Sequence, residues 1–187
     1  MEKAGLGAAD FGTLVHAVLE ARLNGQDFRV PSKFHSRTAD EKAFQELITR
    51  AETMADTFLN SELGKRCAAS GRIAKNGRTA VRESEYRIIT SVTVNGKPVA
   101  VMGQIDLVFE ETDETVVVDF KTDRTENPED HYGQLAVYYQ AAGDIFKKPV
   151  SVWLYYLRSG RAVNATKEVQ EISLEDSALA AWNAACS

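Results

Sequence analysis

The sequence predicts a mixed α/β fold, in which helices surround a central sheet, and three observations support this class. Apolar residues recur at helical spacing in two long segments near the N-terminus. Alternating apolar and polar residues then predict three consecutive strands, joined in part by an Asn95-Gly96 turn. A further helical segment and the β-rich run VSVWLYYL follow, so the elements belong to one sheet with helices around it.

The helices of the N-terminal part come first. Residues 10–24 predict a helix, because apolar side chains recur there every three or four positions. Residues 39–63 predict a longer amphipathic helix. Thr38 and Glu41 have the spacing of a capping box at its start, and Gly64 is expected to end it.

The strands follow from Thr79 onward. The first is expected to end at Asn95-Gly96, a dipeptide typical of type I′ hairpin turns. The second strand spans about residues 98–109, and an acidic turn of residues 110–114 leads into the third strand, TVVVDFK. The three strands therefore predict an antiparallel meander.

The C-terminal part predicts a helix, a strand and a last helix. The helix starts at Pro128 or Glu129 and ends at Phe146, and proline suits its first turn. VSVWLYYL has the composition of a buried, central strand, and residues 173–185 predict an amphipathic helix. The predicted order is ααβββαβα, in one domain over residues 1–187.

The charge of the chain argues against a broad basic surface. The net charge is −5 and the pI is near 5.3, values unlike those of proteins that hold nucleic acid over a whole face. One segment differs, because residues 64–82 contain six basic residues and no acidic residue. It is either a solvated loop or a phosphate-contacting edge, with Arg72 and Lys75 as candidate DNA contacts.

Several classes of protein are excluded. Cys67 and Cys186 are far apart and lack CxxC partners, so cysteine alone builds neither a zinc site nor an iron-sulfur cluster. No apolar run approaches the eighteen or so residues of a membrane span, and the N-terminus lacks a signal-peptide pattern. We therefore expect a cytoplasmic protein without a membrane partner.

Two acidic residues stand in strongly apolar strands. Asp106 lies in GQIDLVFE and Asp119 in VVVDFKTD, near the facing ends of adjacent strands. Because an unpaired carboxylate is costly in such a strand, a cation is expected to compensate. Mg²⁺ is the natural candidate, since it binds one or two carboxylates together with water and phosphate oxygens.

Lys121 is two residues after Asp119, so strand alternation puts both side chains on the same face. Its ammonium group could hold a water in line with a phosphorus atom, or help to deprotonate that water if nearby positive charge lowers its pKa. The three residues together predict metal-dependent hydrolysis of a phosphodiester.

Five blocks occur in a familiar order: GTLVHAVLE, RESEYRI, GQIDLVFE, VVVDFKTD and QLAVYY. Over about residues 9–160 they resemble the RecB-type nuclease domain of the PD-(D/E)xK superfamily, especially the C-terminal nuclease of AddA-like helicase-nucleases. The resemblance implies a restriction-endonuclease-like core, αβββαβ, with extra helices around a mixed central sheet. It also implies a Mg²⁺-dependent deoxyribonuclease in which Mn²⁺ can substitute.

The resemblance also implies roles for individual residues. His16, which follows Gly12 in a GxxxH motif, would ligate or border the metal. Asp106 and Asp119 would be ligands, the carbonyl of Phe120 would add another, and Lys121 would be the catalytic lysine. Without the resemblance, His16 reads as a structural histidine at the flank of an apolar helix.

Three further residues match with alternatives. Glu83 matches the catalytic glutamate that precedes an aromatic residue, although Glu85 is an adjacent alternative and Glu83 could simply face solvent. Gln134 and Tyr138 match a QxxxY motif, and their spacing puts both on one helix face, toward the active site or the DNA backbone. They could also form a plain surface pair.

The expected function is that of an exonuclease domain acting in double-strand break repair and recombination. The cysteine count excludes the cluster-bearing branch, so no iron-sulfur cluster is expected. The short segment before Gly12 favours a domain excised from the C-terminal end of a larger helicase-nuclease, with DNA and a helicase motor as partners. The alternative is a catalytically silent nuclease fold that guides DNA or docks a helicase. Intact Asp106, Asp119 and Lys121 favour the enzyme.

Overall fold

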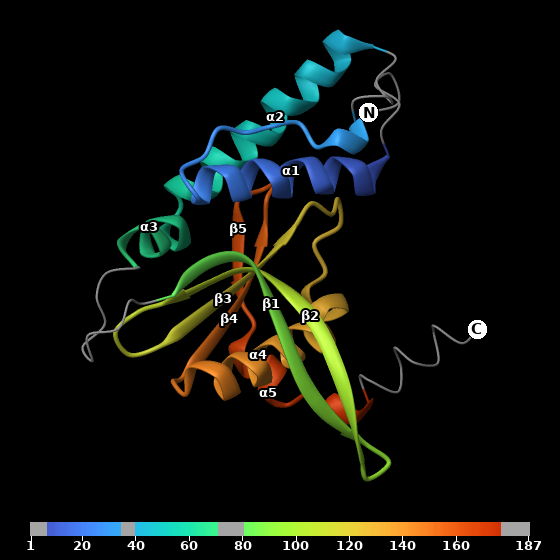
Figure 1. Cartoon of the computed structure of the whole chain (residues 1–187), viewed down its shortest axis with the longest axis vertical. Helices are drawn as coiled ribbons and strands as arrows, with labels where there is room; N and C mark the ends of the chain where they lie inside the picture. Colours follow the sequence, from blue (N-terminus) through green and yellow to red (C-terminus); the bar gives the residue numbers. More distant parts are fainter. Residues whose placement is uncertain (1–6, 35–39, 71–80, 177–187) are drawn as a thin grey trace. The chain divides into compact units, whose positions relative to one another are not determined.

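The computed structural model describes residues 7–34, 40–70 and 81–176 (Figure 1). The chain divides into two compact units. The first contains the chain up to Ala69 together with Phe120–Arg124 and Tyr156–Arg161, and the second contains the remainder. The organisation as one domain stays a prediction.

The first unit is mainly helical. It contains α1 (Ala8–Leu23), the short 3₁₀ helix η2 (Ser32–Phe34), α2 (Glu41–Asn60) and α3 (Glu62–Ala69). Helices α1 and α2 lie side by side (Figure 1) and bury the apolar stripes that predicted them. Arg22 of α1 lies 3.6 Å from the Glu52 carboxylate of α2. The predicted first helix is confirmed.

The predicted capping box of the second helix is wrong. Helix α2 begins one residue after Asp40, whose carboxylate accepts a hydrogen bond of 3.0 Å from the backbone N–H of Ala43. Asp40 therefore satisfies one of the N–H groups that a helix start leaves without a partner. Thr38 lies outside the described residues.

The predicted end of that helix at Gly64 is also wrong. Helix α2 ends at Asn60, and Ser61 starts α3 by accepting a hydrogen bond from the Gly64 N–H at 3.1 Å. Gly64 is buried inside α3, where an added Cβ would lie 2.1 Å from the carbonyl oxygen of Phe58. This glycine therefore permits the backbones of α2 and α3 to approach closely, rather than ending a helix.

The second unit carries most of the sheet. Strands β1 (Arg82–Val94), β2 (Lys97–Glu110) and β3 (Thr115–Lys121) form the predicted antiparallel meander. Asn95 and Gly96 turn with φ of 50° and 71°, as a type I′ turn requires. The meander and its hairpin are confirmed.

Strand β4 (Val150–Tyr156) makes the sheet mixed. The Thr115 N–H donates to the Pro149 carbonyl at 2.8 Å, and the Leu157 N–H donates to the Lys121 carbonyl at 2.9 Å. Because both bonds join corresponding ends, β3 and β4 run parallel. A short strand that the sequence did not predict, β5 (Arg161–Asn164), completes the order β1-β2-β3-β4-β5, so β4 is interior.

The remaining helices belong to the second unit. The predicted helix from Pro128 consists of a 3₁₀ turn, η3 (Pro128–His131), and then α4 (Tyr132–Phe146). Helix α5 (Thr166–Gln170) was not predicted. Of the predicted helix over residues 173–185, the structure describes only the start, where 174–176 are helical. Helix α4 packs on the sheet, since the rings of Phe146 and Tyr86 lie 5.8 Å apart.

A buried ion pair closes the turn between β2 and β3. Glu110, expected in an acidic turn, is only 2 % exposed, and its carboxylate lies 3.1 Å from the Lys148 ammonium. The same carboxylate accepts the Val81 N–H at 2.8 Å. The fold class predicted from the sequence, a mixed sheet with surrounding helices, is confirmed. Among the described helices, none is long and apolar enough to cross a membrane.

Gly64 and Gly143 offer a matched test of the α2–α3 approach, because both are helical glycines. Gly64→Ala should lower the free energy of unfolding by about 2–3 kcal/mol, since the new methyl group meets backbone atoms. Gly143→Ala meets only Val150 at 4.0 Å and should keep or raise stability by up to about 1 kcal/mol. Urea unfolding measures both. Equal stability of the two variants would contradict the close approach.

Candidate active site

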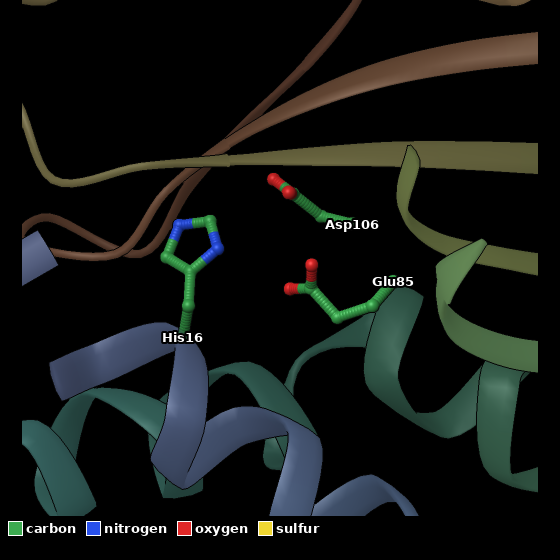
Figure 2. A group of neighbouring side chains, drawn as sticks. All are labelled: His16, Glu85 and Asp106. Carbon is green, nitrogen blue, oxygen red and sulfur yellow. The ribbon is translucent and has the colours of Figure 1, made fainter. Parts of the chain in front are cut away.

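Two carboxylates meet where β1 and β2 pair. Ser84 pairs with Leu107 and Tyr86 with Ile105, so Glu85 and Asp106 lie opposite each other between these pairs. The backbone of Glu85 is left-handed, with φ of 55°, which is rare for a residue with a side chain. Carboxylate oxygens of Glu85 and Asp106 lie within 4.8 Å of each other. Figure 2 shows both side chains, drawn with His16 of the other unit.

Asp119 lies on the next strand. The pairing of β2 with β3 includes Leu107 opposite Val118, and continuing this register by one position puts Asp106 opposite Asp119. Asp119 is only 2 % exposed, whereas Asp106 is half-buried. Three neighbouring strands therefore bring three carboxylates to one part of the second unit, a possible acidic metal-binding group.

In the first unit, His16 lies beside the end of β3. Its ring contacts Phe120 edge to face, with centroids 6.2 Å apart, and Phe120 in turn packs on Phe58 at 4.6 Å. Gly12, one turn before His16, also approaches this segment, since a Cβ there would lie 3.2 Å from the Thr122 hydroxyl. The GxxxH motif thus fixes α1 against the residues that follow Asp119.

Lys121 is the last residue of β3 and is half-buried. It shares a strand face with Asp119, as alternation requires. Its carbonyl bonds to Leu157, so the preceding carbonyl of Phe120 points the other way, away from Leu157. The carbonyl of Phe120 as a ligand stays a prediction.

Tyr138 of α4 holds the backbone of β2. Its hydroxyl donates a hydrogen bond of 2.6 Å to the carbonyl of Gln104, two residues before Asp106, and accepts one of 2.7 Å from the Gln134 amide. Gly103 makes room for the ring, because a Cβ at that position would lie 3.1 Å from Tyr138. The QxxxY and GxID motifs are therefore in physical contact.

The environment of Tyr138 keeps its hydroxyl protonated. Burial, and then the charges of Asp119 and Asp106, raise the pKa of Tyr138 to about 12. The hydroxyl is thus a hydrogen-bond donor throughout the neutral pH range. With 5 % of its side chain exposed, Tyr138 does not match the expected DNA contact, and it acts instead on the strand that carries Asp106. Gln134 is exposed.

The remaining candidates lie elsewhere or outside the description. Glu83 is exposed and pairs with Val108, and the structure brings Glu85 rather than Glu83 to Asp106. Arg72 and Lys75 lie outside the described residues. Sequence reasoning missed the part played by Gly103 and Gln104. The glycine before Ile105-Asp106 was the available signal, because a glycine in a strand often marks a close approach.

The chain is similar to a known nuclease family. A family model described as the PD-(D/E)XK nuclease superfamily matches residues 2–187. A helicase/nuclease protein of Bacillus mycoides, named as an ATP-dependent enzyme subunit, is 30% identical over 191 residues, covering 88% of this chain. The protein of that name from Acetivibrio thermocellus is 28% identical over 176 residues, covering 86%. The chain spans only 14% to 15% of the length of these relatives.

A solved structure shares the fold. A protein from Eubacterium rectale, described as an exonuclease candidate, superposes with a TM-score of 0.53 at 11% identity. The match covers 89% of this chain and 63% of that protein.

Tyr138→Phe tests the support of β2. The change removes the hydroxyl that binds the Gln104 carbonyl and should lower the free energy of unfolding by about 1–2 kcal/mol. Tyr139→Phe is the matched control, because the Tyr139 hydroxyl accepts only an exposed hydrogen bond from Gln170. It should cost less than half as much in the same urea titration. A larger cost for Tyr139→Phe would contradict this support.

Proposed function

Because the chain belongs to the PD-(D/E)XK nuclease superfamily, we propose that it is a Mg²⁺-dependent deoxyribonuclease that hydrolyses phosphodiester bonds. One observation carries the proposal. Glu85 and Asp106 present carboxylate oxygens to each other, and the next strand holds Asp119 and Lys121 on one face. These are the residue types that phosphodiester hydrolysis with a divalent cation requires.

The donor set fits a single hard cation. Ligands of Mg²⁺ lie at 2.0–2.1 Å, so two on opposite sides of one ion are about 4.2 Å apart. The oxygens of Glu85 and Asp106 lie within 4.8 Å, which small side-chain movements bring into that range. We assign these two residues and Asp119 as carboxylate ligands, so Glu85 takes the place expected for Glu83.

His16 and the carbonyl of Phe120 are the further ligands that we propose. Their contact in the first unit, at 6.2 Å between rings, supports a joint role. An imidazole nitrogen suits Mn²⁺ better than Mg²⁺, so Mn²⁺ should also support activity. When bound, a divalent cation lowers the pKa of water and neutralises charge on the phosphate during hydrolysis.

The other residues act around that site. The Lys121 ammonium, on the same face as Asp119, would hold the attacking water and offset negative charge on the phosphate. Tyr138 acts as a positioning residue, because it fixes the backbone two residues before Asp106. Gln134 fixes the hydroxyl of Tyr138 and remains exposed, so it can also face the DNA backbone.

We also propose a cellular setting. The relatives are named as ATP-dependent helicase/nuclease proteins, and the chain matches only about a seventh of their length. This supports a nuclease domain that works with a helicase motor, as an exonuclease in double-strand break repair and recombination. Expected partners are DNA and that motor.

Cleavage of labelled single- and double-stranded DNA tests the enzyme. The whole chain should cut with Mg²⁺ or Mn²⁺ and lose activity in EDTA. Asp119→Asn and Lys121→Ala should abolish cleavage while circular dichroism remains that of the wild type. An Asp119→Asn variant with full activity would overturn the assignment, and a folded wild type that binds DNA without cleaving it would favour the silent module.

Glu83 and Glu85 provide a matched pair on one strand. Glu85→Gln should lower the cleavage rate by about 100-fold or more and weaken Mn²⁺ binding in calorimetry, because a carboxylate ligand is lost. Glu83→Gln should leave both close to wild type, since that side chain is exposed and away from Asp106. The reverse result would return the assignment to Glu83.

A further inference from the structure

Three arginines of the first unit gather around one buried ring. Arg50 of α2 and Arg158, which follows β4, each place the guanidinium carbon 5.3 Å from the centroid of Phe11. Arg124, three residues after Lys121, acts electrostatically on Arg158. Phe11 is fully buried, so its ring is a fixed platform for the two guanidinium groups. We call Arg50, Arg124 and Arg158 the arginine cluster.

The position of Arg158 is set by its neighbours. Its Nε donates a hydrogen bond to the carbonyl of Thr122, which takes one of the five N–H donors of a guanidinium. The side chain is half-buried. Arg158 is therefore held in place, and its remaining donors form a planar group suited to phosphate oxygens.

The arginine cluster is electrostatically unfavourable by itself. Burial first, and then the charges of Arg50 and Arg124, lower the pKa of Arg158, and Asp123 opposes this effect. Asp10, next to Phe11, lies 3.7 Å from the Lys33 ammonium, a cation outside the arginine cluster. Three cations facing Asp123 leave a local excess of positive charge in a chain whose net charge is −5.

We propose that Arg50, Arg124 and Arg158 bind consecutive phosphate groups of a single DNA strand, an inference that rests on the proposed nuclease function. A phosphodiester between the guanidinium groups replaces repulsion with charge-assisted hydrogen bonds. Arginine is better suited to this than lysine, since its planar fork matches the geometry of phosphate. Only three residues separate Arg124 from Lys121, so the arginine cluster is covalently close to the DxK motif.

DNA binding in EDTA tests the arginine cluster independently of cleavage. The anisotropy of a fluorescein-labelled single-stranded oligonucleotide gives the dissociation constant of the whole chain at several salt concentrations. Arg50→Gln and Arg124→Gln change exposed side chains and should leave the fold intact. Each should weaken binding and reduce the slope of log K against log salt by about 0.7, the value for one lost phosphate contact.

Two further variants complete the design. Arg29→Gln changes an exposed arginine of the same unit outside the arginine cluster and should bind as wild type. Arg158→Lys keeps the charge but loses the planar fork, and it should weaken binding for oligonucleotides of any sequence. Unchanged salt slopes for Arg50→Gln and Arg124→Gln would overturn the proposal, as would an equal loss in Arg29→Gln.

The test separates this proposal from the proposed function. If the wild type cleaves DNA but the variants bind normally, the arginine cluster is not a phosphate site and the nuclease assignment stands. If the wild type binds DNA through the arginine cluster but does not cleave it with any metal, the nuclease assignment fails and the phosphate site stands.

Discussion

Repulsion between carboxylates is the constraint on which the second unit depends. Two unit charges about 4 Å apart repel by roughly 4 kcal/mol near a protein surface. Glu85 and Asp106 lie within a comparable distance, and Asp119 follows on the next strand. The antiparallel register of β1, β2 and β3 leaves these side chains no alternative arrangement, since a slip of one residue would turn the apolar side chains of β2 to the wrong face. The sheet is therefore stable at the cost of a site that attracts a cation.

Support for this arrangement comes from behind the sheet. Helix α4 is joined to β2 through Tyr138, whose hydroxyl bonds to a backbone carbonyl. Gly103 is what allows the ring to lie against the strand. Because a fully packed interior tolerates little movement, this contact limits how far the backbone at Asp106 can relax away from the neighbouring charges. Packing thus opposes electrostatic repulsion, and the motif residues on α4 serve the site without touching it.

Much of this could be predicted, because hydrophobic alternation and the Asn95-Gly96 turn specify the meander, and the meander brings Asp106 and Asp119 together. The choice between Glu83 and Glu85 could not, since both have the same strand parity and the left-handed backbone of Glu85 leaves no pattern in the sequence. Gly64 was read as a helix end because local rules favour that role, whereas its contact with Phe58 is tertiary. The arginine cluster was missed for a similar reason. Its members come from three distant segments that only the fold unites.

The backbone of Glu85 has a consequence for how this chain can change. A left-handed φ costs a residue with a Cβ about 1–2 kcal/mol, a cost that glycine avoids. Selection for thermal stability alone would therefore favour glycine or asparagine at this position and discard the carboxylate. Selection for cleavage would retain glutamate and accept the strain. Stability and chemistry thus make opposite demands on one residue, and an engineered, more stable variant would have to gain its stability elsewhere.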